Sequence, residues 1–286
     1  MDDSIELSDR FRYWEMVEQV GTPNSVKGRL RSRVEYWEEV VAAPSPIVSI
    51  IRQGYILPFV SVPEGRYFTN QESALDQAAF VTQAVGELVE NGCVKEVESP
   101  PVVCSPLLVV TGRSGKKWLV INLRYVNKYL WKDKFKYEDI RSALLLFERG
   151  EYMCTFDFKS GYHHIDIHEC SQTYLGFSWL GKYYVFTVLP FGLSTVCYVF
   201  TKLLRPLVRL WRSNGIKVIM YIDNGIIIAP TLEKAMHSGQ YIRASLEAAG
   251  LVCNEAKSLW EPAHSAQWLG FDIDLEKKRQ ISSKRC

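Results

Sequence analysis

The clearest structural signal in this chain is the stretch Met220-Tyr-Ile-Asp-Asn-Gly-Ile-Ile-Ile228. Here two strongly apolar runs, 218–222 and 225–229, are separated by Asp223-Asn224. Two residues between strand-like runs is the length of a tight hairpin turn. The stretch therefore predicts a β-hairpin with an acid at its tip, although Asp, Asn and Gly are also favoured in turns for backbone reasons alone.

Apolar periodicity predicts further strands and helices on both sides of this hairpin. The other strand candidates are 183–189, 268–273, and the pair 107–110 and 118–121, which predicts a hairpin with a glycine-rich, basic tip. The helix candidates are 26–41, stopped by Pro44 and Pro46; 74–88, with Asn70 as N-cap and Asn91-Gly92 as the stop; 196–210; and 232–249, which ends at Gly250. Strands mixed with helices, with hairpins among the strands, predict an α+β fold.

Composition limits the class of protein. Apolar residues make up 47% and charged residues 23% of the 286 residues, which is typical of a globular protein with a sizeable core. The seven cysteines are scattered, without a Cys-x-x-Cys pair, which argues against a zinc ribbon or a disulfide framework. The N-terminus lacks the features of a signal peptide, and no apolar run approaches the roughly 20 residues that span a bilayer. We therefore expect an intracellular protein, cytoplasmic or nuclear, without a membrane partner.

Positive charge is concentrated in one segment. The formal net charge is only +2, but residues 113–136 hold eight cations against one anion, Asp133. The cations are Arg113, Lys116, Lys117, Arg124, Lys128, Lys132, Lys134 and Lys136. Such a block predicts either a localised site for a polyanion or a solvated basic face.

Three more segments contain residues suited to chemistry, and each also has an ordinary structural explanation. In 154–164, Asp157 lies in an apolar strand, where it is equally suited to cap a turn. In 189–200, Gly192 permits close approach of a ligand, but the segment is also a simple helix start that Ser194 or Thr195 caps. The segment 254–257, followed by 268–274, suggests only a loop and a strand when it is taken alone.

Taken in order, these segments resemble the reverse transcriptase family. Asp157, followed five residues later by the aromatic Tyr162, resembles the first palm motif, and Leu189-Pro-Phe-Gly192 resembles the second. Tyr221-Ile-Asp-Asn224 resembles the Tyr-x-Asp-Asp box. Lys257 and Trp268-Leu-Gly-Phe271 are similar to the later palm motifs, and 105–124 is similar to the fingers hairpin. The stretches 36–60 and 91–94 look most like the tyrosine-recombinase-bearing retrotransposons of animals, the DIRS-like group.

The resemblance implies both a fold and a reaction. It implies the fingers and palm of a right-hand polymerase, with an antiparallel palm sheet packed on helices and a truncated thumb. We expect an N-terminal extension with an amphipathic helix at 1–70 and a fingers-and-palm domain at 71–286, with fingers to about 150 and palm from about 151, and no RNase H or recombinase domain. The implied reaction is RNA-directed DNA synthesis from dNTPs, with an RNA or DNA template and a primer as partners. The oligomeric state stays open.

The resemblance also implies roles for individual residues. Two-metal nucleotidyl transfer uses divalent ions roughly 3.5–4 Å apart, and Mg²⁺ prefers carboxylate oxygens. Asp157 and Asp223 are the expected ligands of Mg²⁺, or of Mn²⁺ in its place; Asn224 completes the catalytic box, and Lys257 protonates the departing pyrophosphate. The expected nucleotide contacts are Phe158 through its backbone, Tyr162, which excludes a 2′-hydroxyl, Phe191, Gly192, Lys117 and Arg113. The expected nucleic-acid contacts are Lys116, Arg124, Trp268 and Gly270.

Two departures from the family pattern bear on activity. The box ends in Asn224 instead of a second Asp, which removes one unit of negative charge beside the metals. Trp118 stands where the family usually has Arg or Lys, although Lys117 is adjacent. With the chain ending at Cys286, these features predict a decayed or fragmentary copy of an element. The alternative function is a catalytically inactive, nucleic-acid-binding remnant.

Histidines and tryptophans suggest other sites. His163, His164 and His168 invite a zinc site, but the resemblance assigns the first two to a polymerase motif, and zinc is not expected here. Trp37, Trp118 and Trp131 are expected in the core, except for those near the basic segment.

Overall fold

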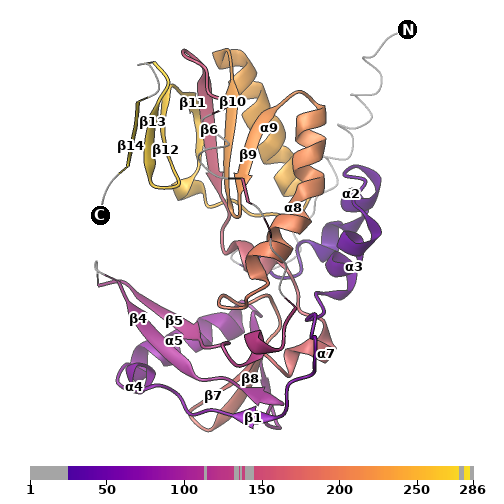
Figure 1. Cartoon of the computed structure of the whole chain (residues 1–286), viewed down its shortest axis with the longest axis vertical. Helices are drawn as coiled ribbons and strands as arrows, with labels where there is room; N and C mark the ends of the chain where they lie inside the picture. Colours follow the sequence, from indigo (N-terminus) through magenta and orange to yellow (C-terminus); the bar gives the residue numbers. More distant parts are fainter. Residues whose placement is uncertain are drawn as a thin grey trace.

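Two halves make up the structure, and the chain passes between them more than once (Figure 1). The computed structural model describes residues 25–112, 115–131, 135, 137–138, 145–276 and 280–283. The upper half holds an antiparallel sheet with two long helices, and the lower half holds a mixed sheet and a separate hairpin. In the described part of the chain, no helix has the length and apolar character needed to cross a membrane.

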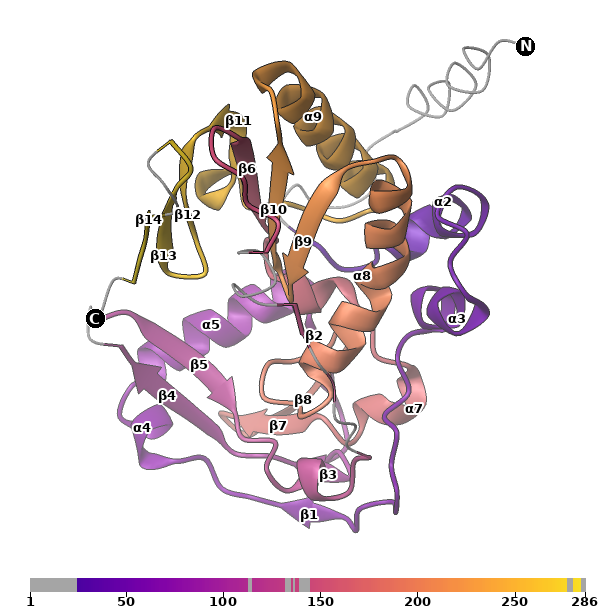
Figure 2. The same ribbon diagram turned by 45° about the horizontal axis from the view of Figure 1, so that its top comes forward.

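The upper sheet has the strand order β11-β6-β10-β9 and is entirely antiparallel. Its strands are β6 (Tyr152–Asp157), β9 (Lys217–Tyr221), β10 (Asn224–Ala229) and β11 (Leu259–Ala263). The helices α8 (Val196–Ser213) and α9 (Leu232–Ala248) pack against one side of it (Figures 1 and 2). Large side chains such as Phe156, Trp211 and Phe200 fill the space between sheet and helices. The predicted antiparallel sheet on helices is confirmed.

A second, smaller core lies on the other side of the upper sheet. It separates that sheet from the three strands β12 (Ser265–Trp268), β13 (Phe271–Asp274) and β14 (Gln280–Ser283). The single strand predicted at 268–273 is therefore wrong. A turn at Leu269-Gly270 splits this run into two strands, because both residues have positive φ, 51° and 77°, as a two-residue hairpin turn requires.

The lower sheet has the order β1-β3-β7-β8-β2 and mixes parallel and antiparallel pairs. Its strands are β1 (Arg66–Tyr67), β2 (Val94–Val97), β3 (Val103–Cys104), β7 (Gly176–Trp179) and β8 (Lys182–Phe186). The hairpin β4 (Leu107–Thr111) and β5 (Lys117–Ile121) pairs as predicted. Because β7 and β8 follow residue 151 but pair within the lower sheet, the lower half draws its strands from both sides of the predicted boundary at 150.

The N-terminal helices differ from the expected ones. Instead of one helix over 26–41, the chain forms the short helices η2 (Arg31–Arg33), α2 (Val34–Glu39) and α3 (Ser45–Gln53). Pro44 and Pro46 do not simply end a helix. Pro44 is the N-cap of α3 and Pro46 lies in its first turn, where proline is well tolerated. Trp37 anchors this region as predicted, since it is fully buried and its indole N–H donates to the Ala249 carbonyl at 2.9 Å.

The second predicted helix is also divided, into α4 (Glu72–Leu75) and α5 (Ala78–Glu90). Asn70 is not its N-cap. The Asn70 side chain instead accepts from the Leu107 N–H and donates to the Ser178 carbonyl, which ties β4 to β7. The stop at Asn91-Gly92 is confirmed, with Gly92 at φ 69°. The remaining short helices are η3 (Val126–Lys128), η4 (Gly161–His164), α7 (Glu169–Gln172) and η5 (Glu255–Lys257).

Candidate active site

The upper sheet brings Asp157 and Asn224 together. Asp157 is the last residue of β6 and Asn224 the first of β10, and the two are direct partners in the antiparallel register. Directly opposed side chains lie on the same face, with Cβ atoms roughly 4.5–5.5 Å apart. Farther along the same strands, that face carries Met153 and Ile226 into the second core. Asp157 and Asn224 therefore lie at the end of the sheet where this core stops.

Gly225 fixes the register that produces this pairing. It lies opposite Phe156, and a Cβ atom at Gly225 would stand only 2.1 Å from Cζ of the Phe156 ring. That ring stacks on Trp260, with centroids 5.6 Å apart and planes 4° apart. A side chain at position 225 would displace the ring, so the small residue beside the site is required by packing.

The acid at the hairpin tip is Asp223, as predicted, but the turn residues differ from the prediction. Tyr221 pairs with Asn224, so the turn consists of Ile222 and Asp223, and Asn224 already belongs to β10. Ile222, not the Asn-Gly pair, has positive φ, at 56°. A β-branched residue in this region is strained, and such strain persists only where the surroundings impose it.

Contacts on several sides position Asp223. Its carbonyl accepts the Phe158 N–H at 3.0 Å, and its Oδ1 accepts the Asn224 Nδ2–H at 3.0 Å. Gly161 lies against it, since a Cβ there would stand 3.3 Å from the Asp223 Cβ. Because the Phe158 N–H is donated to Asp223, the contact of the Phe158 backbone with a triphosphate, which stays a prediction, would have to use another backbone group.

Asp157 is a poorly hydrated carboxylate with one cation close by. Its side chain is only 14% exposed, and the Lys257 Nζ lies 3.7 Å from its Oδ1. Burial raises the pKa of Asp157, and the negative charge of Asp223 raises it further, while Lys257 and the Asn224 amide act in the opposite direction. The two acids are therefore close enough to repel each other, and any added cation would relieve that repulsion.

The loop after α9 positions Asp157 through two residues that the sequence analysis did not select. The Ser258 Oγ accepts the Asp157 N–H at 3.2 Å, and the Asn254 N–H donates to the Asp157 carbonyl at 2.7 Å. Between them, η5 carries Lys257. The segment 254–257 was singled out, but only Lys257 received a role, because contacts between a loop and a strand a hundred residues away leave no local pattern.

Tyr162, Phe191 and Gly192, which were predicted to contact the nucleotide, lie together beside Asp157 and Asp223. The rings of Tyr162 and Phe191 lie 4.8 Å apart, and Phe191 is 55% exposed. The Tyr162 hydroxyl lies 3.2 Å from the Cys197 sulfur, and burial raises its pKa. Asn127, a residue that the sequence analysis missed, holds the loop after Phe191 by donating to the Gly192 carbonyl and accepting from the Ser194 N–H.

The basic hairpin separates the cations that the sequence places side by side. Successive strand residues point to opposite faces. Lys117 lies over the Phe80 ring of α5, at 6.0 Å, whereas Trp118 is 44% exposed and has Lys116 above it at 5.8 Å. Lys117 therefore does not replace a cation at position 118, and Lys116 is the cation on the Trp118 side. Arg124 is exposed and bonds to Asn122 through its Nε.

Several predicted contacts fall elsewhere. Arg113, Lys132, Lys134 and Lys136 lie outside the described residues. Trp268 is only 2% exposed and packs in the second core, so its indole cannot meet nucleic acid. Gly270 lies in the β12–β13 turn, where its backbone is the group that could contact nucleic acid.

The histidines form no common site. Burial lowers the pKa of His163 and of His164 to about 4, so both are neutral near pH 7. His164 accepts the Val252 N–H through Nε2 and faces the Gly161 carbonyl through Nδ1. His168 caps α7 by accepting the Cys170 N–H. The rings of His164 and His168 thus each have a structural role, and the absence of zinc here stays a prediction.

The donor set fits a hard divalent ion only in part. Asp157 and Asp223 supply carboxylate oxygens, which Mg²⁺ prefers, and Mg²⁺ sites commonly use one or two carboxylates together with substrate phosphates and water. Within the described ranges, no group of three or more His, Cys, Asp or Glu residues is arranged to hold a metal. The position that would complete such a group is Asn224.

Comparisons with known proteins agree on one family. The family described as "Reverse transcriptase (RNA-dependent DNA polymerase)" matches residues 107–273, more than half of the chain. The chain is 27% identical over 214 residues to the retrovirus-related Pol polyprotein from transposon opus of Drosophila melanogaster, covering 71% of this chain and 21% of that protein. It is 32% identical over 168 residues to the corresponding polyprotein from transposon 412 of the same organism, covering 57% of this chain and 13% of that protein.

Solved structures show the same fold. A foamy viral protease-reverse transcriptase in complex with double-stranded DNA aligns over 95% of this chain and 50% of that one, with a TM-score of 0.65 and 18% identity. The same kind of protein in complex with an RNA/DNA hybrid aligns over 94% of this chain and 37% of that one, with a TM-score of 0.62 and 18% identity. The chain spans about a fifth of the length of the opus relative.

Proposed function

This chain belongs to the reverse transcriptase (RNA-dependent DNA polymerase) family, and from that premise we propose that it is the fingers-and-palm part of a retrotransposon polymerase. The proposed reaction is template-directed nucleotidyl transfer from dNTPs to a primer on an RNA or DNA template. The observation that carries the proposal is the meeting of Asp157, at the end of β6, with Asp223, at the tip of the β9–β10 hairpin.

Asp157 and Asp223 are the residues that would hold divalent metal, on which this family generally depends. Metal ions at such a site lower the pKa of an attacking hydroxyl and neutralise phosphate charge. Asp157 is held for this role by Ser258 and Asn254 through its backbone, and Asp223 by the Phe158 amide. The raised pKa of Asp157 supports the proposal, because a carboxylate that is costly to ionise alone gains most from a cation.

Tyr162, Phe191 and Gly192 are proposed to form the wall against the incoming nucleotide. Phe191 is exposed while Tyr162 is packed behind it, so the face offered to a ligand is rigid. Lys257, 3.7 Å from Asp157, is proposed as the proton donor to the leaving pyrophosphate. Lys117 and Arg113 are proposed to contact the incoming nucleotide. Lys116, Arg124 and the turn at Gly270 are proposed to contact nucleic acid, whose phosphates favour a basic surface.

An inactive nucleic-acid-binding remnant is the second candidate function. It is favoured by one observation: the Asn224 amide donates a hydrogen bond to the Asp223 carboxylate at 3.0 Å, where a third acid would add charge. Primer extension separates the two functions. The chain is expected to extend a labelled primer in Mg²⁺ or Mn²⁺, and Asp157→Asn is expected to abolish extension while leaving duplex binding unchanged. Duplex binding without extension in either metal would favour the remnant.

We further propose that residues 1–70 are an extension, that fingers run to about 150 with β7 and β8 added to them, and that the rest is palm. The element is proposed to belong to the DIRS-like, tyrosine-recombinase-bearing group. This assignment is supported by the stretches 36–60 and 91–94, which resemble that group. Both stretches lie outside residues 107–273, the region that matches the reverse transcriptase family. Sequencing of the genomic DNA around the gene tests it, since a recombinase reading frame nearby is expected.

A further inference from the structure

Two cavities lie side by side along α8, and neither is lined by Asp157 or Asp223. The aromatic cavity, about 370 Å³, is lined by Tyr55, Trp131, Tyr137, Tyr198 and the hydroxyl residues Ser194 and Thr195. The arginine cavity, about 280 Å³, is lined by Arg205, Arg209 and Arg212 of α8 together with Glu138 and Ile222. Both volumes lie near the lower range of small-ligand sites.

The aromatic cavity has the chemistry of a site for a planar heterocycle. Four aromatic rings supply flat apolar walls, and Ser194 and Thr195 supply hydroxyl groups at the start of α8. Trp131 is 46% exposed, so its indole is available to a ligand, and its ring stands edge-on to Tyr198 at 6.1 Å. Nucleobases stack on such rings whatever their sequence, because each base has a π-face.

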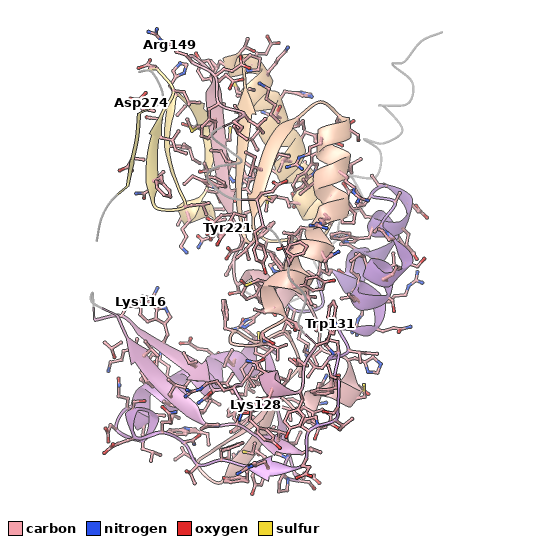
Figure 3. The ribbon with its side chains drawn as sticks, viewed as in Figure 1. Lys116, Lys128, Trp131, Arg149, Tyr221 and Asp274 are labelled. Carbon is pink, nitrogen blue, oxygen red and sulfur yellow. The ribbon has the colours of Figure 1, made fainter. Side chains whose placement is uncertain are left out.

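A line of ring contacts connects this cavity to the catalytic hairpin. Tyr221, which directly precedes the turn at Ile222-Asp223, lies 6.3 Å from the Tyr137 ring. Tyr137 lies 5.1 Å from Phe135, which in turn lies 5.3 Å from Tyr198. Figure 3 shows Tyr221 near the centre of the molecule and Trp131 at the junction of its halves, away from Lys116. One extended nucleic-acid strand can therefore reach both the β9–β10 hairpin and the aromatic cavity.

Cations accompany the rings along one face of α8. Lys202, Arg205, Arg209 and Arg212 follow each other at spacings of three or four, which places them on the same side of a helix. The Lys202 ammonium lies 5.4 Å from the Tyr198 ring, and the Arg205 guanidinium lies 4.4 Å from the Phe135 ring. A positively charged surface with aromatic rings beside it is the usual composition of a surface for single-stranded nucleic acid.

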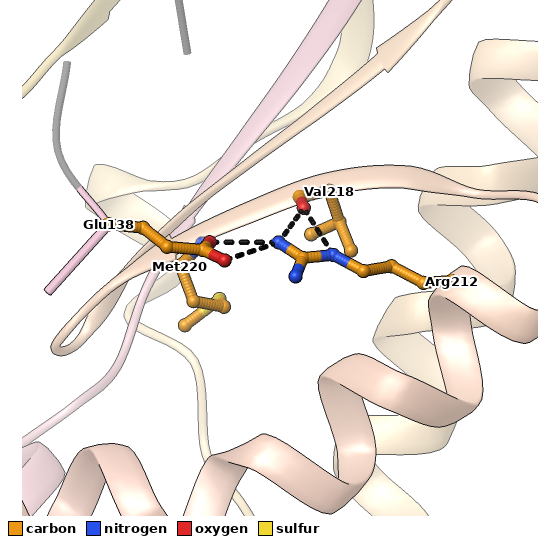
Figure 4. A network of polar contacts seen from close by, with 4 residues as sticks. All are labelled: Glu138, Arg212, Val218 and Met220. Carbon is orange, nitrogen blue, oxygen red and sulfur yellow. Dashed lines mark hydrogen bonds and ion pairs between the residues drawn. The ribbon is translucent and has the colours of Figure 1, made fainter. Parts of the chain in front are cut away.

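Glu138 does not cancel this charge. Both of its carboxylate oxygens accept from the Arg212 Nη2 at 2.8 Å, and the same guanidinium donates to the Val218 carbonyl (Figure 4). Arg212 and Glu138 are thus a structural pair that fixes the β9 edge. Arg205 and Arg209 are exposed, and within the described ranges neither forms an ion pair. They supply the net positive charge of the arginine cavity.

We propose that this face of α8 binds an unpaired stretch of the template strand, with a base in the aromatic cavity and neighbouring phosphates at Arg205 and Arg209. The inference rests on the proposed function, because a polymerase that copies a template holds one strand whose bases are not yet paired. Paired bases of a primer-template duplex present no free face to Trp131 and Tyr198. The face therefore favours single strands over duplex.

Binding without metal tests the inference independently of catalysis. Fluorescence anisotropy of a labelled, mixed-sequence single-stranded RNA and of a blunt RNA/DNA duplex is measured in EDTA. Trp131→Ala and Tyr198→Ala are each expected to weaken single-strand binding by roughly five- to hundredfold, with Trp131→Phe close to wild type. Duplex affinity is expected to stay within about twofold.

The phosphate half is tested by the double variant Arg205→Gln, Arg209→Gln. In this variant, the slope of log affinity against log salt concentration is expected to be shallower than in the wild type, by about 0.7 for each single-strand phosphate that the two arginines neutralise. Lys182→Gln is the matched control, because Lys182 is an exposed cation on β8, paired with Glu96 at 2.9 Å. Both arginines are exposed, so this variant keeps the fold even where an aromatic variant does not.

The outcomes separate this inference from the proposed function. Unchanged single-strand affinity in the arginine variant, or an equal weakening of single-strand and duplex binding, overturns the inference. Normal extension by wild type together with either result leaves the polymerase proposal standing. Selective weakening of single-strand binding in a chain that does not extend a primer supports the site and counts against the polymerase.

Discussion

Replacing Asn224 with Asp is expected to raise activity in Mg²⁺ by about a hundredfold. Asn224 is the direct register partner of Asp157 and the hydrogen-bond donor to Asp223, so a carboxylate at this position would add a third acid to the pair. The change is nearly isosteric. It exchanges a hydrogen-bond donor for a full negative charge at the place where metal would be held.

The magnitude follows from the register. Opposed side chains stand roughly 5 Å apart. Taking the same separation as the distance between the added charge and a dication held at Asp157, a unit charge at an effective dielectric constant near 20 is worth about 6–7 kcal/mol before relaxation. If side chains and water recover more than half of this, about 2–3 kcal/mol remains, which corresponds to about two orders of magnitude in rate. Without metal, the added charge repels Asp157 and Asp223, so the free protein is expected to melt at a lower temperature.

Two measurements are needed. Single-turnover primer extension by wild type and Asn224→Asp is compared at equal folded concentration, in Mg²⁺ and in Mn²⁺. The rise of the melting temperature on adding Mg²⁺ is measured in parallel, and it is expected to be larger for the variant. Gln53→Glu is the matched control, because it makes the same amide-to-acid change on α3 and keeps the acceptor that Ser49 uses.

Comparable, robust extension by wild type and Asn224→Asp would refute this reasoning, because the third acid would then be dispensable. An equal Mg²⁺-induced shift in both proteins would refute it as well, even if neither extends a primer. If only the thermal shift differs, the metal site is repaired, and extension is then measured on a longer form of the chain.

Three further predictions concern other parts of the molecule. Gly225→Ala is expected to lower the free energy of unfolding by about 1–3 kcal/mol, because its Cβ would meet a buried ring. Gly86→Ala, with open space around the residue, is expected to raise the free energy of unfolding by about 0.5–1 kcal/mol. Denaturant melts measure both. Because burial raises the pKa of Asp157, the metal-free protein is expected to lose stability as pH rises from the ordinary pKa of Asp to the raised value, and Asp157→Asn is expected to lack that segment of the pH profile. Lys116→Ala is expected to reduce the salt slope of duplex binding by about 0.9 if it contacts one phosphate, and an unchanged slope would assign this lysine to solubility alone.

The local sequence pattern was enough to predict the helices and strands whose ends are marked by turn residues or glycines. The hairpin β9–β10, the helices α8 and α9, and the stop after α5 follow from apolar runs bounded by turn residues and glycines, and all were predicted. The N-terminal helices and the strand at 268–273 were not predicted correctly. There the apolar period continues across a break that depends on backbone conformation, as at Leu269, whose positive φ is not expected of leucine.

The sequence by itself determined which residue types are available for chemistry, their order along the chain, and through that order the family. Only the tertiary structure decided which of them meet. Strand register places Asn224 opposite Asp157, alternation separates Lys117 from Trp118, and burial removes Trp268 from the surface. These outcomes depend on contacts between segments far apart in the chain, such as Ser258 with Asp157, and no local periodicity encodes them. Because side chains alternate between the two faces of a strand, a shift of one residue in the pairing of β6 with β10 would have given every residue of the site different neighbours.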